Sequence, residues 1–198
     1  MRYDKDHKAQ TRSVVLDNAS MRFRQEGIQA VGIASLMADA GLTHGGFYAH
    51  FTSKEKLVEA AIGKAFDTSV ESLRKVAEEP GEQAPMEALI DAYLSARHRD
   101  YPGYGCAAAA LGAEVARLAP ETRQAYGLHL DRLIVLIAQQ LDQKKDETLR
   151  KQTATAIFST MVGALQMSRT VESAAQSLAF IEAGKSAALA LARSFGLR

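Results

Sequence analysis

A small polar set, left exposed when Phe47 and Phe51 share the buried face of one helix, is the part of this chain best suited to contact a nucleic acid. Its members are His44, Gly45, Gly46, Tyr48 and His50. Each glycine costs a helix about 1 kcal/mol relative to alanine, so two in one helical turn indicate either a strained backbone or a surface that must come very close. A helix that points its N-terminal turn into the major groove of DNA has that need, and its free amides and positive dipole end favour phosphate.

Two short helices joined by a tight turn would hold this set at the surface. The segment 33–40 places Leu36 and Ala40 on one face, and Gly41 suits the left-handed backbone that ends a helix. Thr43 can cap a second helix by accepting a hydrogen bond from an amide of its first turn. A turn of about three residues between two helices predicts a helix-turn-helix.

The residues on either side support this interpretation. Leu42 and Phe47 occupy the two positions of a hydrophobic staple at the start of the second helix. Thr52 and Glu55 form a capping box for a third helix, and Lys54 lies in its exposed first turn, where a cation can meet the DNA backbone. The alternative is an ordinary helical hairpin with an awkward cap.

This N-terminal region resembles the DNA-binding domain of the TetR family of transcriptional regulators. The resemblance covers roughly residues 10 to 58 of the sequence. The matching residues are Ala19, Phe23, Gly27, Ile33, Leu36, Ala40, Gly41, Phe47, Tyr48, His50, Phe51, Ser53, Lys54, Glu55 and Leu57.

The resemblance implies a role for each polar residue. Phosphates would be held by Thr43, His44, Tyr48, His50 and Lys54, while Gly45 and Gly46 would face the groove floor. The family often carries hydroxyl residues at the start of the 33–40 helix, where this chain has Gly32, Ile33 and Ala34, so contact there would come from backbone amides or Ser35. Because no Arg, Asn or Gln stands in the recognition turn to pair bidentately with a base, the operator sequence cannot be read from it.

Composition sets broader bounds on the protein. The chain has 198 residues, 47% of them hydrophobic, which is enough for a sizeable core in one or two domains. Its formal net charge of +1 is too small to indicate nucleic-acid binding by itself. Because the N-terminus is charged and the apolar runs are far shorter than a membrane span, we expect a cytoplasmic protein that no membrane holds.

The sequence carries no pattern typical of an enzyme. It has no phosphate-cradling glycine motif, no His-Glu-x-x-His and no serine or cysteine in a recognisable nucleophile setting. Its single cysteine, Cys106, excludes an internal disulfide and a multi-cysteine metal site. We therefore expect no catalytic residues, no metal and no cofactor.

Turn residues divide the remainder into helices and predict an all-α fold. Pro and Gly pairs interrupt the chain at Pro80 and Pro102, and Lys144-Lys145-Asp146 ends a further helix. The expected segments are a long helix over 53–79, a helix from 85, a loop over 101–105, a short segment over 106–118 and helices over 120–143, 147–171 and 174–195. We expect a helix-turn-helix domain over residues 1–52, and a helical connector, ligand-binding and dimerisation domain over 53–198.

The last two helices are unusually rich in small residues, which let helix backbones approach closely. In the TetR family the last two helices pair with their copies as a four-helix dimer interface, so the resemblance favours a homodimer over the alternative of an internal core pair. The expected interface residues are Ala164, Ser168, Gly184, Ala188 and Leu191.

The resemblance also implies a C-terminal cavity for a small effector that releases a repressor from its DNA operator. The candidate lining residues are Tyr93, Cys106, Tyr126, Leu133, Phe158, Met161, Leu165 and Gln166. This aromatic and flexible surface predicts an apolar or aromatic effector, although each residue could instead belong to the core. The charged cluster 97–100 is typical of a solvated helix end.

Two alternatives to effector control remain open. Cys106 stands at the expected start of a helix, where amides and dipole favour a reactive thiolate, so it could sense oxidants or electrophiles. Its other interpretation is a small buried hydrophobe before four alanines. A ligand-independent DNA-binding protein would share the same N-terminal domain.

Overall fold

The computed structural model describes residues 2–197, with side chains from His7 onward. Over this part of the chain it confirms the expected all-α fold. The elements are α1 (Arg2–Glu26), α2 (Ile33–Asp39), η1 (His44–Ala49), α3 (Lys54–Glu78), α4 (Pro85–Tyr93), α5 (Ala96–Asp100), η2 (Pro102–Tyr104), α6 (Ala107–Val115), α7 (Pro120–Ala138), α8 (Glu147–Thr170) and α9 (Ala174–Phe195), where η marks a 3-10 helix.

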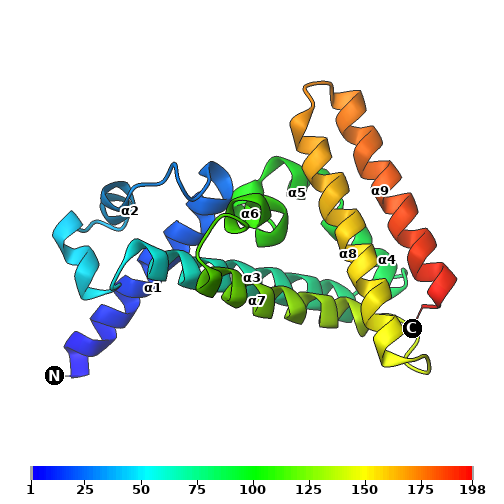
Figure 1. Ribbon diagram of the computed structural model, residues 1–198, viewed down its shortest axis with the longest axis horizontal. Coiled ribbons are helices and arrows are strands. Elements are labelled where there is room, and N and C mark those ends of the chain that lie inside the picture. The colour runs from blue at the N-terminus through cyan, green and yellow to red at the C-terminus, as the bar shows by residue number, and fades with distance from the viewer. Residues whose placement is uncertain (1, 198) are drawn as a thin grey trace.

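The elements α1, α2 and η1 form one end of the molecule (Figure 1). They share a small core of fully buried apolar side chains, namely Val15, Ala19, Phe23, Leu36 and Phe47. Gly27 and Gly41 end α1 and α2 with φ of 91° and 71°, a backbone that glycine adopts without strain. The expected stop at Gly41 is therefore present.

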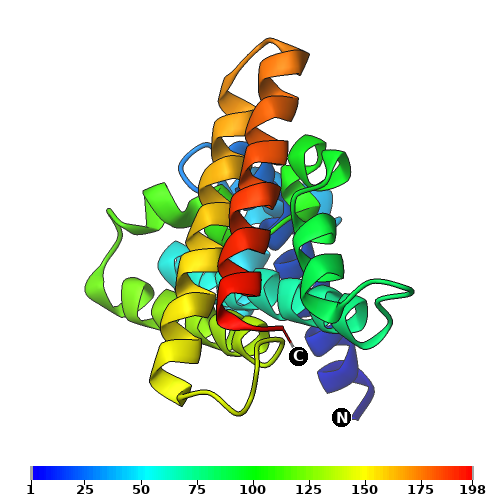
Figure 2. The same ribbon diagram turned by 90° about the vertical axis from the view of Figure 1, so that its right-hand side faces the viewer.

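The long helix α3 runs from this end into the larger part of the molecule, where α7 lies along it (Figure 1). At the far end α8 and α9 lie side by side and project as an arm, as two perpendicular views show (Figures 1 and 2). No helix among residues 2–197 is both long and apolar enough to span a membrane.

The starts of two helices differ from the sequence expectations. The segment after Thr43 is a 3-10 helix, because the adjacent glycines are poor α-helix formers. The Thr43 side chain makes no capping hydrogen bond there. The cap of α3 is Ser53, whose Oγ accepts from the amide of Lys56 at 3.3 Å, so Thr52 does not form the predicted capping box.

The helix that begins at Pro85, as expected, is short. It ends at Tyr93, and Ser95 starts α5 by accepting a hydrogen bond from the His98 amide at 3.2 Å. The expected loop over 101–105 contains the single turn η2. Similarly, α7 ends at Ala138, before the expected stop at 143.

Candidate nucleic-acid interface and effector cleft

The residues singled out for DNA contact lie together on one surface of the α2–η1 end. Thr43, His44, Gly45 and Tyr48 are exposed, while His50 and Lys54 are half-buried. Tyr48 is 65% exposed although it contacts Phe47 edge-on, so its hydroxyl end is held away from the core. We call this the reader surface.

The two glycines of the reader surface have no role inside the chain that requires glycine. A β-carbon added at Gly45 would meet nothing within 4 Å, and one added at Gly46 would meet Met37 at an ordinary 3.6 Å. Neither residue is among the described residues with positive φ. Neither backbone strain nor internal crowding therefore requires glycine at these two positions.

Two cations that the sequence pattern did not single out stand beside His50. The guanidinium of Arg12 lies 4.7 Å from the centre of the Phe51 ring, a cation–π contact that holds it in place. Burial lowers the pKa of His50, and the charges of Lys8 and Arg12 lower it further, so this imidazole is neutral near pH 7. Its Nδ1 is buried without a hydrogen-bond partner among the described residues. The signal in the sequence was a basic N-terminal helix, which is usually only a solvated face.

Ser35 is tied into the structure behind the reader surface. Its hydroxyl donates to the carbonyl of Gly32 at 2.9 Å and accepts from Arg22 at 3.1 Å. Arg22 also pairs with Asp39 at 2.7 Å and thereby joins α1 to α2. The Ser35 hydroxyl would therefore have to leave the Gly32 carbonyl before it could donate to a phosphate.

A cleft of about 850 Å³ opens between α3, α4, α5 and η2. The residues that line it are Thr68, Ser69, Ser72, Leu73, Val76, Ala92, Tyr93, Ser95, Arg97, His98, Tyr101, Tyr104, Gly105 and Cys106. Of the predicted effector contacts, only Tyr93 and Cys106 belong to it. With serine, threonine, arginine and histidine side chains among its lining, the cleft is also more polar than the aromatic and flexible surface predicted for the C-terminal cavity.

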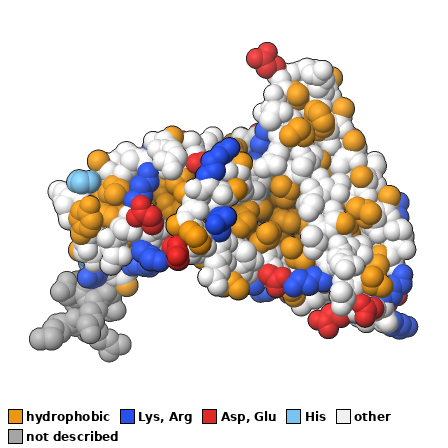
Figure 3. Space-filling model, in the orientation of Figure 1, with side chains coloured by type: hydrophobic (Ala, Val, Ile, Leu, Met, Phe, Trp, Pro, Cys, Tyr) orange, Lys and Arg blue, Asp and Glu red, His pale blue; other side chains and the backbone are white. Residues whose placement is uncertain are grey.

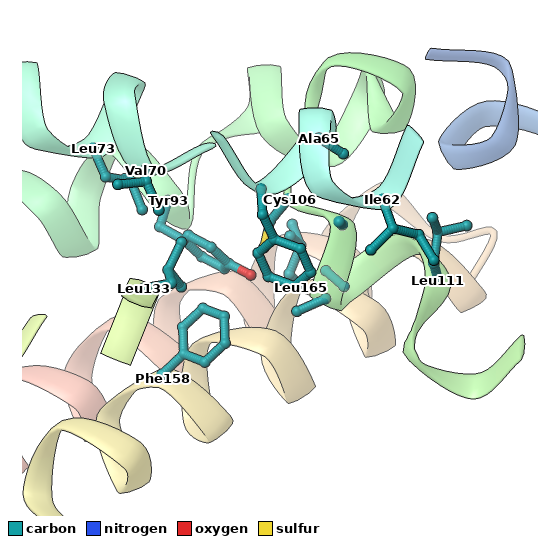
Figure 4. Packing of buried hydrophobic residues seen from close by; sticks show 14 of the residues in the cluster. Ile62, Ala65, Val70, Leu73, Tyr93, Cys106, Leu111, Leu133, Phe158 and Leu165 are labelled. Carbon is teal, nitrogen blue, oxygen red and sulfur yellow. The ribbon is translucent and has the colours of Figure 1, made fainter. Parts of the chain in front are cut away.

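The other predicted effector residues belong mainly to the packed core. Leu133, Phe158, Met161 and Leu165 are buried, and Figure 4 shows the ring of Phe158 beneath that of Tyr93. These two rings are 5.8 Å apart in an edge-on contact.

Tyr126 and Gln166 also make contacts within the protein. Tyr126 packs edge-on against Phe66 at 5.1 Å, and the side-chain amide of Gln166 donates to the Ala109 carbonyl at 3.1 Å. Tertiary packing therefore uses most of the predicted pocket as core.

Cys106 is the N-cap residue of α6, as its position before the alanines suggested, but it is only 3% exposed. Its backbone amide donates to Nε2 of His98 at 2.9 Å, and Nδ1 of His98 lies 2.7 Å from the Tyr93 carbonyl. A carbonyl only accepts and an amide only donates, so His98 carries its proton on Nδ1. Cys106 is thus almost wholly withdrawn from solvent, and this burial does not favour a sensor of oxidants.

The small residues of α8 and α9 lie largely between the two helices of one chain. A β-carbon at Gly184 would come within 2.3 Å of the Ala164 β-carbon, which shows that glycine permits this close packing. Ser168 and Ala188 are buried within the chain at 2% and 0% exposure. We therefore remove Ser168, Gly184 and Ala188 from the expected dimer surface, because all three residues are buried within one chain.

The outward face of the arm is apolar as well. Met167 is 46% exposed and Phe180 is 39% exposed, and Ala156, Ala183 and Ala187 are exposed beside them. Hydrophobic side chains are visible along this arm in Figure 3. From residue 152 to 168 the sequence of α8 has no charged residue. We call this the outer face of the arm.

Comparison with known proteins places the reader surface in a family. Residues 15–61 match the model of bacterial regulatory proteins of the tetR family. The HTH-type transcriptional regulator TtgR of Pseudomonas putida is 28% identical over 89 residues, which are 45% of this chain and 42% of TtgR. The chain thus spans less than half the length of the curated relatives it matches.

Solved structures extend the similarity in fold. Reduced NemR of E. coli has a TM-score of 0.73 and 21% identity over 90% of this chain and 95% of NemR. A TetR transcriptional regulator from Chloroflexus aurantiacus has a TM-score of 0.70 and 24% identity over 94% of this chain and 96% of its own. The shared fold includes the C-terminal helices, which the family model does not reach.

The family model begins within α1 and ends within α3, so it covers α2, η1 and the reader surface between them. The all-helical fold of the whole chain agrees with that match. The resemblance inferred from the sequence is thereby confirmed: residues 15–61 of this chain match the N-terminal domain of the tetR family of bacterial regulatory proteins.

Proposed function

We propose that this protein is a homodimeric, sequence-specific DNA-binding repressor that a small molecule releases from its operator. The observation that carries the proposal is the Gly45-Gly46 pair on the reader surface. Gly45 is exposed and Gly46 is half-buried, and no contact within the chain requires glycine at either position. A DNA groove that must come close to this backbone explains the pair. Such a function acts on the chromosome, and we propose the cytoplasm as its location.

The proposed DNA contacts combine hydrogen-bond donors with charge. Thr43, His44, Tyr48, His50 and Lys54 hold phosphates, while Gly45 and Gly46 face the groove floor, and Ser35 contributes its amide at the start of α2. To this set we add Lys8 and Arg12, which lie beside His50. The elements α1, α2 and η1 end before α3 begins at Lys54, so residues 1–52 and 53–198 remain our proposed domains.

The proposed dimer is built on the outer face of the arm. Two half-sites on DNA require two readers related by a two-fold axis, and an exposed apolar surface without charge suits such a contact. In the proposed dimer interface, the buried residues Ser168, Gly184 and Ala188 are replaced by Met167, Phe180 and Ala187. The half-buried Ala164 and Leu191 remain at the margin of the interface.

The proposed effector is an aromatic or apolar small molecule bound in the cleft beside α3. A ligand shifts an equilibrium only through its different affinities for two states, so the effector must prefer the arrangement that does not fit DNA. A tenfold loss of operator affinity requires about 1.4 kcal/mol of coupling. Burial of Cys106 disfavours the alternative of thiol sensing, and a DNA-binding protein without an effector would show no such coupling.

The variant Gly45→Ala tests the carrying observation. An added methyl group has open space in the free protein, so stability should be unchanged or raised by up to about 1 kcal/mol, while DNA affinity should fall about tenfold, which corresponds to 1.4 kcal/mol. Gly127→Ala on α7 is the matched control, because a β-carbon there also meets nothing within 4 Å. Equal DNA affinity of both variants by fluorescence anisotropy would reject close approach at Gly45.

A further inference from the structure

Positive charge lies on the α5 and η2 side of the cleft between α3, α4, α5 and η2. None of the residues that line the cleft is acidic, and Arg97 is the charged residue among them. Arg97 is exposed and makes no ion pair with any described residue. Its neighbour His98 is neutral near pH 7, because burial lowers its pKa to about 4.

Two further guanidinium groups lie directly behind the cleft wall. Arg24 of α1 donates to the Gly105 carbonyl at 2.5 Å, and Arg169 of α8 donates to the carbonyls of His98 and Arg99. Both are largely withdrawn from solvent, and their described hydrogen bonds go to carbonyl or hydroxyl oxygens, with no carboxylate among them. Buried charge without an ionised partner is costly.

The carboxylates that adjoin cleft-lining residues in the sequence are already paired, and among them Glu71 binds Arg74 at 3.6 Å and Lys75 at 3.5 Å. Asp100 binds Arg99 at 2.7 Å, Asp91 binds Lys185 at 3.1 Å and Asp67 binds Arg132 at 2.7 Å. The charges of Arg24, Arg97 and Arg169 therefore add up on the α5 and η2 side of the cleft, and a concave site focuses such a potential on a small ligand.

The rest of the cleft suits a flat apolar body. Leu73, Val76 and the ring of Tyr93 line it, and Tyr101 and Tyr104 are 60% and 76% exposed at its mouth. The hydroxyls of Thr68, Ser69 and Ser95 already donate to backbone carbonyls, so they offer acceptors and no spare proton. An anionic group would therefore be held at the Arg97 side and away from Thr68 and Ser69.

We propose that the effector of this protein is an aromatic carboxylate, with its negative charge beside Arg97 and its ring between α3 and the tyrosines of η2. This proposal rests on the proposed effector function and specifies its ligand. The carboxylate would accept charge-assisted hydrogen bonds from the guanidinium, in which Arg presents a planar pair of donors.

The same wall of the cleft is fastened to the reader. Besides the bond from Arg24 to Gly105, the side-chain oxygen of Gln25 accepts from the Gly103 amide at 3.2 Å. Both α1 residues thus hold the segment 103–105, against which the ligand lies. A ligand that displaces this segment acts directly on α1, which gives binding in the cleft a route to the reader surface.

The test compares carboxylic acids with their neutral amides. Benzoate, phenylacetate and 2-naphthoate, each paired with its amide, are titrated into the full-length native protein by calorimetry without DNA. We expect at least one acid to bind about tenfold more tightly than its amide, the effect of one charge-assisted contact. Arg97→Gln should abolish that preference. The matched control is Arg123→Gln on α7, an exposed arginine outside the cleft, which should keep it.

Three results would overturn the inference: no binding of any acid, equal affinity of each acid and its amide, or an unchanged preference in Arg97→Gln. Circular dichroism checks that each variant is folded. DNA affinity is measured separately by anisotropy, with and without the bound acid. An acid that shows the charge preference while DNA affinity stays constant supports this binding site and contradicts the proposed release from the operator.

Discussion

At the scale of single residues, the proposed phosphate contacts differ in the charge they bring to DNA. Lys54 brings a full positive charge at the start of α3, whereas His50 is neutral because burial and the nearby cations lower its pKa. Tyr48 offers only a hydroxyl on an exposed ring. Long-range attraction to DNA therefore depends on Lys54 and on the α1 cations Lys8 and Arg12.

This difference gives Lys54→Ala a specific signature. Each neutralised phosphate contributes about −0.9 to the slope of log affinity against log salt concentration, so the variant should lower that slope by about 1 and weaken binding to all sequences alike. Lys151→Ala, on α8 and distant from the reader, is the control. A slope equal to that of the native protein would remove Lys54 from the interface.

His98 links the cleft wall to acid stability. Its ordinary pKa of 6.5 falls to about 4 in the folded protein, mainly through burial. As pH decreases below 6.5, the imidazole takes up a proton in the unfolded chain before it does so in the folded protein. The contribution of His98 to the free energy of unfolding is therefore full above pH 6.5 and falls by about 3 kcal/mol as pH decreases toward 4.

The variant His98→Gln should lose this part of the pH dependence. We expect the free energy of unfolding, measured by urea denaturation at pH 7 and pH 4, to change by about 3 kcal/mol less in the variant than in the native protein. The same pH dependence in both proteins would show that His98 is already free to take up a proton in the fold.

At the scale of elements, local sequence patterns predicted where helices begin and end. They did not predict which neighbour each face of a helix contacts. Glycine and proline predicted the ends of α2 and α3 and the start of α4, because these residues restrict the backbone wherever they lie. The sequence also showed that α8 and α9 carry small residues. It could not show that Gly184 faces Ala164 in the same chain, since that depends on how the pair is rotated against the body.

The same limit applies to the predicted effector residues. Helical spacing identified Phe158 and Leu165 as inward-facing, but an inward stripe lines a cavity or fills a core with equal ease. The lining of the cleft includes polar residues of α3, such as Ser69 and Ser72, which no apolar pattern selects.

The predicted cap of α3 was wrong by one residue, Thr52 in place of Ser53, because two adjacent hydroxyl residues compete for one position.

The outer face of the arm makes a testable prediction for α9. Ala187→Arg places a long charged side chain on an exposed, apolar surface and should convert a dimer into monomers with unchanged helical content. Light scattering would then report a mass near 21.4 kDa. Ala113→Arg, an exposed alanine of α6, should remain dimeric. A dimer of normal stability in Ala187→Arg would place the partner contact elsewhere.

At the scale of the whole molecule, one set of helices joins the reader, the cleft and the arm. The helix α3 begins at the reader surface and forms a wall of the cleft, and α1 holds the opposite wall through Arg24 and Gln25. On α8, Arg169 binds the backbone of α5. A change at the cleft therefore reaches both the reader and the proposed dimer contact without passing through a flexible linker.

Selection of DNA from a random duplex library tests the central claim most directly. A two-fold dimer with one reader in each copy should enrich an inverted repeat whose half-site centres lie about 10 base pairs, or a multiple of that, apart. The Gly45→Ala variant, used in parallel, should enrich the same repeat poorly or not at all. Recovery of sequences no different from the starting library, or of an unsymmetrical site, would contradict the account of a dimeric sequence-specific regulator.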